Sequence, residues 1–281
     1  MQQFRVLVIN DTESVFKNMC YFDGTTTVKI NKEDNEKCIS STEKVSYNYI
    51  CKNTINMNKN NVYPNKAELM IKSMDSFDVS FDLKRRGLNP VVLNMASADY
   101  PGGGYKRGAG AQEESLFRRS CLHLCLDGKQ KKELYPIDTT DAIYTNDVIV
   151  IKDNELHNYS YYENDYKKMS IITCPAVKCN KNITMVDYDK NVYNIMYKKL
   201  DLIFRMAFYY GHDCIVLGAF GCGAYHNPAM KVASICRELY LKYAYCFKNV
   251  SFAILSDHND IFNSRRFNSY TNYEAFELVL A

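Results

Sequence analysis

Two adjacent glutamates, Glu113 and Glu114, follow a stretch that holds five glycines between residues 102 and 110. Glycine carries no side chain that would bar a ligand from the backbone, and it adopts positive φ angles freely. A pair of carboxyl groups can act in general acid–base catalysis when their environments differ. The same pair could instead complement the positive end of a helix dipole, a contribution of about 0.3–1 kcal/mol. Because the glycines leave the space beside the two glutamates free of side chains, we favour a ligand site.

The elements around this pair are a predicted strand and a predicted helix. An apolar run at 91–93 follows Pro90 and ends at Asn94, and its short, partly β-branched character predicts a buried strand. Gln112 begins a predicted helix whose apolar positions recur every three to five residues, at Leu116, Phe117, Cys121 and Leu124. The open N-terminus of such a helix offers unpaired N–H groups to a ligand.

A second glycine loop lies at 218–226, between a predicted strand at 214–217 and a predicted helix from Asn227-Pro228 to about residue 247. Asparagine at the N-cap and proline at the first helical position are a preferred pair. A further strand is predicted at 251–255. Such a loop can cradle phosphate with backbone N–H groups, but the lysine and serine of a P-loop are missing.

The glycine run 102–104, seven intervening residues and then Gln112-Glu113-Glu114 resemble the signature of poly(ADP-ribose) glycohydrolase, a hydrolase built on the macrodomain fold. The flanks at 92–97 and 115–120 are similar to the microbial branch of that family. The loop at 218–227 is similar to the diphosphate-binding loop of macrodomains, and Pro175-Ala176-Val177 also fits the microbial enzymes. The resemblance covers roughly residues 75–260.

The resemblance implies that Glu114 is the acid/base and that Glu113 accepts hydrogen bonds from ribose hydroxyls. It implies hydrolysis of ribose–ribose bonds in poly(ADP-ribose) to release ADP-ribose, with no cofactor and no metal. The substrate-binding residues that it implies are Asn94, Gly102, Gly103, Gly104, Gly110, Gln112, Gly218, Phe220, Gly221, Cys222, Gly223, Ala224 and Tyr225.

Several other residues have two interpretations. Phe220 and Tyr225 could pack on ribose or adenine, or could lie in the core or at the rim. Asp257 could reach the adenine or end a strand in a turn. His226 is expected to face solvent, and we expect the adjacent Arg118 and Arg119 to be solvated or salt-bridged.

Alternating strands and helices predict an α/β domain whose ligands bind at the carboxyl ends of the strands, so both glycine loops could face one cleft. The resemblance implies a macrodomain-like three-layer α/β/α fold with a mixed, largely parallel sheet and an N-terminal helical extension. We expect residues 1–74 to form that extension and residues 75–281 the glycohydrolase domain. Locally, we expect a strand at 4–9, a helix capped by Asn10, helices at 76–86 and 192–210, and strands at 147–152 and 170–174. Residues 25–66 show no sustained period and are expected to be extended or partly ordered.

Charge is nearly balanced, with 35 basic and 32 acidic residues, so no DNA-binding surface is expected. No apolar run is long enough to span a bilayer. The chain has an odd number of cysteines, 11, and they do not show the spacing of a disulfide framework. Both observations favour reduced thiols in the cytoplasm or nucleus. Cys121 and Cys125 would share a helix face while His123 points elsewhere, so we expect no metal there and activity that survives a chelator.

Three alternative functions remain open at this point. The same fold could serve a non-enzymatic ADP-ribose reader, against which the two glutamates argue. It could serve a hydrolase that removes single ADP-ribose units from proteins. Outside this class, an NAD- or nucleotide-binding interaction module would use the acids only to cap a helix.

Overall fold

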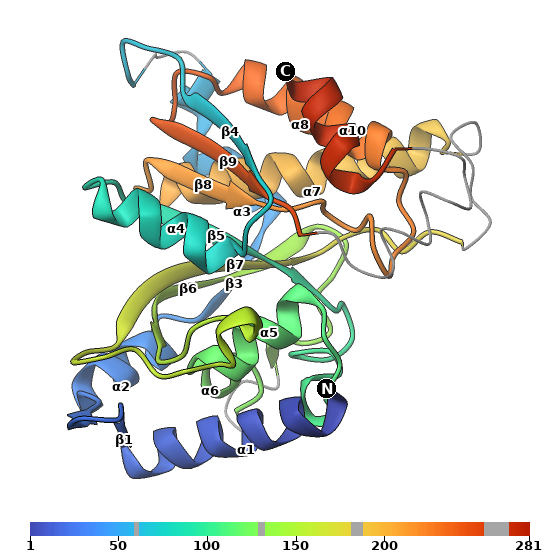
Figure 1. The fold of residues 1–281 in the computed structure, drawn as a ribbon. Helices are drawn as coiled ribbons and strands as arrows, with labels where there is room; N and C mark the ends of the chain where they lie inside the picture. The colour runs from blue at the N-terminus through green and yellow to red at the C-terminus, as the bar shows by residue number, and fades with distance from the viewer. Residues whose placement is uncertain (59–61, 129–132, 181–187, 256–269) are drawn as a thin grey trace. The chain divides into compact units, whose positions relative to one another are not determined.

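The computed structural model describes residues 1–281 except 59–61, 129–132, 181–187 and 256–269 (Figure 1). Its helices are α1 Gln2–Asn18, α2 Lys32–Ser40, α3 Tyr47–Asn53, α4 Ser76–Arg85, α5 Gln112–Arg119, α6 Leu122–Leu126, α7 Lys190–Tyr209, α8 Ala229–Lys242 and α10 Asn272–Leu280. Its strands are β1 Cys20–Phe22, β2 Thr27–Lys29, β3 Glu43–Ser46, β4 Glu68–Lys72, β5 Pro90–Ala96, β6 Asp141–Val150, β7 Lys167–Pro175, β8 Cys214–Leu217 and β9 Asn249–Ala253.

Seven strands are hydrogen-bonded in the order β3-β6-β7-β5-β8-β9-β4, and β1 pairs with β2 separately. The neighbours β5, β8, β9 and β4 run parallel, whereas β6 and β7 are antiparallel, so the predicted mixed, largely parallel sheet is confirmed. The chain forms two compact units. The first consists of Met1–Lys44, Ala96–Ile137 and Ile143–Thr173, and the second of Val45–Met95, Asp138–Ala142 and Cys174–Ala281.

The second unit is a three-layer α/β/α arrangement. Its strands align so that Leu69, Val250, Ile215 and Val91 are neighbours across the sheet. The crossovers β4-α4-β5 and β8-α8-β9 run in opposite directions along the sheet, and right-handed crossovers therefore place α4 and α8 on opposite faces (Figure 1). Helices α7 and α10 pack beside α8. Because both faces are covered, β8 and β9 are buried throughout.

A buried carboxylate, Asp201 of α7, joins three helices of this unit. Its Oδ2 accepts hydrogen bonds from Arg205 Nε at 2.7 Å and Tyr47 OH at 2.9 Å. Its Oδ1 accepts from Lys242 Nζ at 2.8 Å and Tyr243 OH at 2.5 Å. Burial alone raises the pKa of Asp201, but these donors outweigh it and hold the pKa below its usual value.

The first unit contains the antiparallel pair β6 and β7 and the helices α1, α2, α5 and α6. Helix α1 packs against α5 and α2 packs against α6. The predicted strand at 4–9 is wrong, and so is the cap at Asn10, because α1 runs without a break from Gln2. Its buried residues, among them Val8, Thr12 and Val15, recur at helical spacing, whereas a short apolar run does not by itself distinguish strand from helix.

The expectation of an extended or partly ordered segment at 25–66 is wrong for the described residues, which include β2, α2, β3 and α3. Asn31 caps α2 by accepting from the N–H groups of Glu33 and Asp34, and Ser46 caps α3. Each element buries only one or two side chains, so no sustained period marks it in the sequence. The boundary between an extension at 1–74 and a domain at 75–281 stays a prediction.

The other predicted helices and strands are present, but some bounds differ: β6 begins six residues before the strand predicted at 147–152, and α8 ends five residues before 247. Helix α4 is capped by Asp75 and followed by Gly87 at φ +78°. Strand β8 has the expected bounds, and α7 and β7 lie where predicted. Helix α8 begins one residue late, with Pro228 at the N-cap, and ends at Lys242. The side chain of Asn227 is instead used to close the preceding loop.

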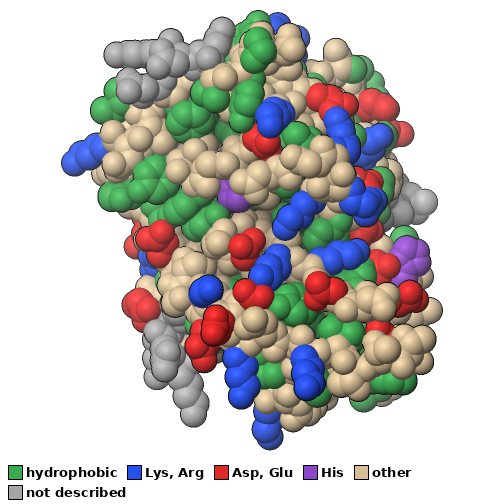
Figure 2. Space-filling model, turned by 90° about the vertical axis from the view of Figure 1, so that its left-hand side faces the viewer, with side chains coloured by type: hydrophobic (Ala, Val, Ile, Leu, Met, Phe, Trp, Pro, Cys, Tyr) green, Lys and Arg blue, Asp and Glu red, His purple; other side chains and the backbone are tan. Residues whose placement is uncertain are grey.

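The surface carries charges of both signs. Figure 2 shows basic and acidic side chains interspersed over the face that it draws, without a field of one sign. Among the described residues, no helix is both long and apolar enough to cross a membrane.

Candidate active site

The two glutamates lie in the first turn of α5, which starts without a side-chain cap. Both are buried, and both turn back onto the glycine loop that precedes the helix. Glu113 accepts hydrogen bonds from the backbone N–H of Ser97 at 2.8 Å (Oε2) and of Gly102 at 3.1 Å (Oε1). The two oxygens of Glu113 therefore bind the two ends of the segment 97–102. Hydrogen bonds from N–H donors favour the ionised form of a carboxyl group.

Glu114 is bound differently. Its Oε1 accepts a hydrogen bond from the backbone N–H of Gly104 at 3.0 Å. Its Oε2 is buried and has no hydrogen-bond partner among the described residues. A buried polar atom without a partner is costly and points to a functional role. One oxygen of Glu114 is thus fixed by the loop, while the other makes no hydrogen bond with the described residues.

Gly103 makes the close approach between loop and acids possible. Its φ is +54°, and a Cβ atom there would lie 2.7 Å from Glu114 Oε1 and 3.3 Å from Glu113 Oε2. Gly102, at φ +71°, would place a Cβ 2.5 Å from the ring of Tyr105. Any side chain at these positions would displace the loop or the carboxylates.

Arg118 and Arg119 are both fully buried, so the expectation that they are solvated is wrong. Arg118 donates from Nη1 to the carbonyl of Ala109 at 2.6 Å and from Nε to Tyr159 OH at 3.0 Å. Arg119 donates from Nε to the carbonyl of Lys152 at 3.1 Å. Arginine is suited to such carbonyl contacts because its fork carries five donors. Arg118 thereby ties the helix of the glutamates to the end of the glycine loop.

Arg5 of α1 also supports the loop, although no local sequence pattern predicted this contact. Its guanidinium makes a bidentate ion pair with Glu155, in which Nε and Nη2 each donate to a carboxylate oxygen at 2.8 Å. Its Nη1 donates to the carbonyl of Gly108 at 3.5 Å. The Glu155 carboxylate raises the pKa of Arg5, and the charge of Glu114 acts in the same direction. A side chain on Gly110 would collide with this guanidinium.

A hollow of about 440 Å³ adjoins the glycine loop within the first unit. It is open to solvent, and a small polar ligand would fit it. Its lining combines aromatic rings with charged groups: Tyr100, Pro101, Gly103, Gly104, Tyr105, Lys106, Arg107 and Asp127.

The second glycine loop belongs to the second unit. Asn227 closes it by donating from Nδ2 to the carbonyls of Gly221 at 3.0 Å and Val177 at 2.7 Å. Gly221 has φ +74°, and a Cβ there would lie 2.5 Å from the Cβ of Ala176. Phe220 is fully buried, so of its two predicted positions it has the one in the core. Tyr225 is partly exposed.

The remaining predicted positions are split between the units. Asn94 on β5 is fully buried in the second unit, and Gly218, Cys222, Gly223 and Ala224 lie on the second loop. The first unit holds Gln112 and Gly110 beside the glutamates. His226 is partly exposed, with φ +58°. Asp257 lies outside the described residues.

Comparison with known proteins shows the family to which the chain belongs. The family model described as "Microbial-type PARG, catalytic domain" matches residues 10–153, about half of the chain. The chain belongs to the microbial-type PARG family. The matched part of this PARG domain includes Glu113, Glu114 and their glycine loop. The chain is therefore a glycosidase that acts on poly(ADP-ribose). No curated protein matches the sequence.

Solved structures of bacterial PARG share its fold. The poly(ADP-ribose) glycohydrolase of Thermomonospora curvata is 22% identical with a TM-score of 0.82, covering 98% of each chain. Its complex with the inhibitor ADP-HPD has a TM-score of 0.79 at 22% identity and the same coverage. The enzyme of Deinococcus radiodurans in complex with ADP-ribose is 22% identical with a TM-score of 0.74, covering 89% of this chain and 98% of that one. The macrodomain-like fold of this PARG domain agrees with them.

Proposed function

We propose that Glu114 is the acid/base with which this glycohydrolase cleaves the ribose–ribose O-glycosidic bond and releases ADP-ribose. The observation that carries the proposal is the difference between the two acids. Glu113 has both oxygens bound by backbone N–H groups, whereas Glu114 keeps one buried oxygen without a partner among the described residues. Two carboxyl groups in different environments are suited to different roles.

The proposed reaction has two proton transfers at Glu114 Oε2. As the glycosidic bond breaks, Oε2 gives its proton to the leaving ribose oxygen, and the sugar passes through an oxocarbenium-like state. The resulting carboxylate then takes a proton from the attacking water, which completes hydrolysis and restores the acid. Glu113 would stay ionised, accept hydrogen bonds from ribose hydroxyls and stabilise the positive charge of that state.

We assign the other substrate contacts by the same proposal. The loop at 218–225 would bind the diphosphate through backbone N–H groups of Gly221, Cys222 and Gly223, and Asn94 would contact the ribose. The Thermomonospora enzyme with ADP-HPD and the Deinococcus enzyme with ADP-ribose support a ligand that contains ADP-ribose. Tyr225, being partly exposed, is available to pack on ribose or adenine.

The expected partners are poly(ADP-ribose) and ADP-ribosylated proteins in cytoplasm or nucleus, with no membrane and no DNA. Support for a reducing compartment comes from the cysteines, none of which is disulfide-bonded among the described residues.

The test is to incubate the purified protein with poly(ADP-ribose) and, separately, with a mono-ADP-ribosylated protein, and to identify the products. We expect free ADP-ribose from the polymer. A reader would bind the polymer without releasing anything, and a mono-ADP-ribosyl hydrolase would act on the modified protein alone. Either of these results would contradict the proposed reaction.

A further inference from the structure

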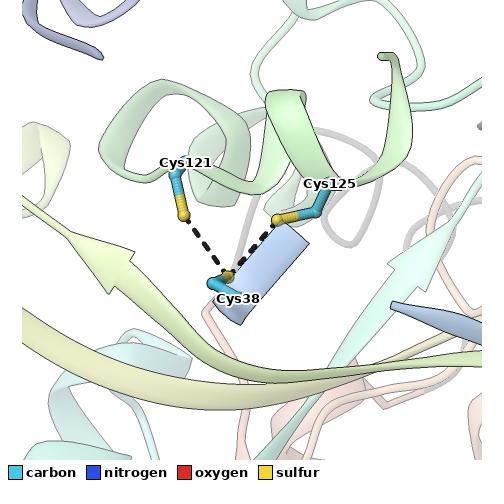
Figure 3. Close-up of side chains that lie close together, drawn as sticks. All are labelled: Cys38, Cys121 and Cys125. Carbon is cyan, nitrogen blue, oxygen red and sulfur yellow. Dashed lines mark hydrogen bonds between the residues drawn. The ribbon is translucent and has the colours of Figure 1, made fainter. Parts of the chain in front are cut away.

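Three cysteines from two separate segments, α2 and the start of α6, meet in the first unit (Figure 3). The Sγ of Cys38 in α2 lies 3.6 Å from the Sγ of Cys121 and 3.4 Å from that of Cys125 in α6. All three sulfurs lie within 4.8 Å of one another, and all three residues are buried. Residues 38 and 121 are far apart in sequence, so the cluster exists only in the folded chain.

These distances are close to those of sulfur ligands around one metal ion. With a metal–sulfur distance of about 2.3 Å, two sulfurs of a tetrahedral site lie about 3.8 Å apart. The sulfur of Cys38 would therefore have to move away from each of the other two by only a few tenths of an ångström to reach this spacing. Figure 3 shows the side chains of Cys121 and Cys125, from one segment, on either side of the sulfur of Cys38.

Packing of small buried thiols is the competing explanation, since the same distances also fit ordinary S–H···S contacts. One contact favours a ligand. The backbone N–H of Ile149 donates to the Sγ of Cys121 at 3.2 Å. Contacts of this kind orient the sulfur ligands of metal sites.

We propose that Cys38, Cys121 and Cys125 bind a thiophilic metal ion of the Zn²⁺ or Cu⁺ class through three thiolates. The ion replaces the three S–H protons, which pass to solvent, and three metal–sulfur bonds form without any change of oxidation state. Thiolates select such soft or borderline ions over Mg²⁺ and Ca²⁺. This revises the expectation, based on Cys121 and Cys125 alone, that no metal binds there.

The described part of the chain offers no fourth His, Cys, Asp or Glu ligand within this cluster. His123 is directed elsewhere, since its Nδ1 lies 3.1 Å from the carbonyl oxygen of Ser120 and its ring packs edge-on against Phe16. The site is therefore three-coordinate in protein ligands, and a small exogenous ligand would complete a tetrahedron around Zn²⁺.

The ion would link α2 to α6, which follows the helix of the glutamates in the chain. It would contribute to folding, because a site assembled from separate segments does not exist in the unfolded chain. The proposed reaction at Glu114 uses no metal ion, so we still expect turnover to survive a chelator.

The experiment uses the full chain, reduced, unfolded and refolded with one equivalent of Zn²⁺ or Cd²⁺, so that burial does not block entry. After desalting, we expect one ion per chain, a thiolate-to-Cd²⁺ charge-transfer absorption and a higher Tm than without metal. Cys38→Ser should lose all three. Cys236→Ser, which changes an equally buried cysteine of α8 outside the cluster, should keep them.

Absence of retained metal in the wild-type protein, equal retention by Cys38→Ser, or loss in Cys236→Ser would overturn the proposal. X-ray absorption of the Zn²⁺-loaded wild-type protein keeps the test decisive if Cys38→Ser does not fold. Three sulfur neighbours at about 2.3 Å support the site, and fewer than three refute it.

Discussion

Gly103 lies so close to Glu114 that a Cβ on the glycine would stand 2.7 Å from the Oε1 of the acid. The proposed acid/base is therefore positioned against a glycine whose φ of +54° disfavours other residues and whose missing Cβ leaves room for the carboxylate. Its Oε1 accepts from Gly104 N–H, while Oε2 is left for the reaction.

Gly103→Ala should lower kcat/KM by about 10²-fold, because displacement of a catalytic group by 1 Å has effects of that order. Gly87→Ala is the matched control, since Gly87 also has positive φ, +78°, but a Cβ there meets nothing within 4 Å. Both variants should lose about 1–2 kcal/mol of stability from backbone strain. Steady-state kinetics and denaturant unfolding measure the two effects, and equal turnover in the two variants would count against the account.

Glu113→Gln should impair both binding and turnover. The amide would place an NH₂ group opposite one of the N–H donors of Ser97 and Gly102, which now bind the two carboxylate oxygens. Leaving such a donor unsatisfied costs about 1–3 kcal/mol, so the loop should shift. Calorimetry with ADP-ribose should show weaker affinity alongside reduced turnover. Unchanged affinity with normal turnover would remove Glu113 from the site.

A negative charge in the second loop should weaken binding of the diphosphate. Gly221→Glu is unsuitable as a test, because any side chain there would collide with Ala176 and Asn227. Ala224 is exposed, so Ala224→Glu adds charge without disturbing packing. We expect its Kd for ADP-ribose to rise about 5- to 100-fold relative to Ala224→Gln, from roughly 1–3 kcal/mol of repulsion. The difference should shrink at high salt. Equal affinities of the two variants would exclude this loop from phosphate binding.

Asp201 should make the fold sensitive to acid. Its donors hold the folded-state pKa below the unfolded value of about 3.9, so between the two values the unfolded chain binds more protons. Its contribution is therefore fully present above about pH 4 and is lost as pH falls through the folded pKa. Asp201→Asn should cost about 3 kcal/mol at neutral pH and much less in acid. Urea unfolding across this range measures it, and a pH-independent difference would contradict the assignment.

The chemistry of the first glycine loop could be predicted because it is local in sequence. Gly103 and Glu114 are eleven residues apart, and the turn between them is encoded by glycines and by the start of a helix. Helix ends such as that at Gly87 were also predictable, since a left-handed cap selects glycine. Helix α8 begins one residue later than predicted, because the side chain of Asn227 forms hydrogen bonds within the preceding loop instead of capping the helix.

Features that depend on contacts between distant segments could not be predicted, because no local sequence pattern encodes them. Arg118 is buried because Tyr159, 41 residues later, accepts its hydrogen bond. Arg5 reaches Gly108 and Glu155 across more than 100 residues. Cys38 meets Cys125 across 87 residues, so spacing arguments applied to Cys121 and Cys125 alone could not find the cluster.

Turnover of poly(ADP-ribose) by Glu114→Gln tests the central claim most directly. The amide oxygen can still accept from Gly104 N–H, and the NH₂ group takes the place of the unpartnered Oε2, so the fold and ADP-ribose affinity should be retained. Turnover should fall by about 10²–10⁴-fold or more, because the group that transfers the proton is gone. Near-normal hydrolysis by a folded Glu114→Gln protein that still binds ADP-ribose would contradict the mechanism.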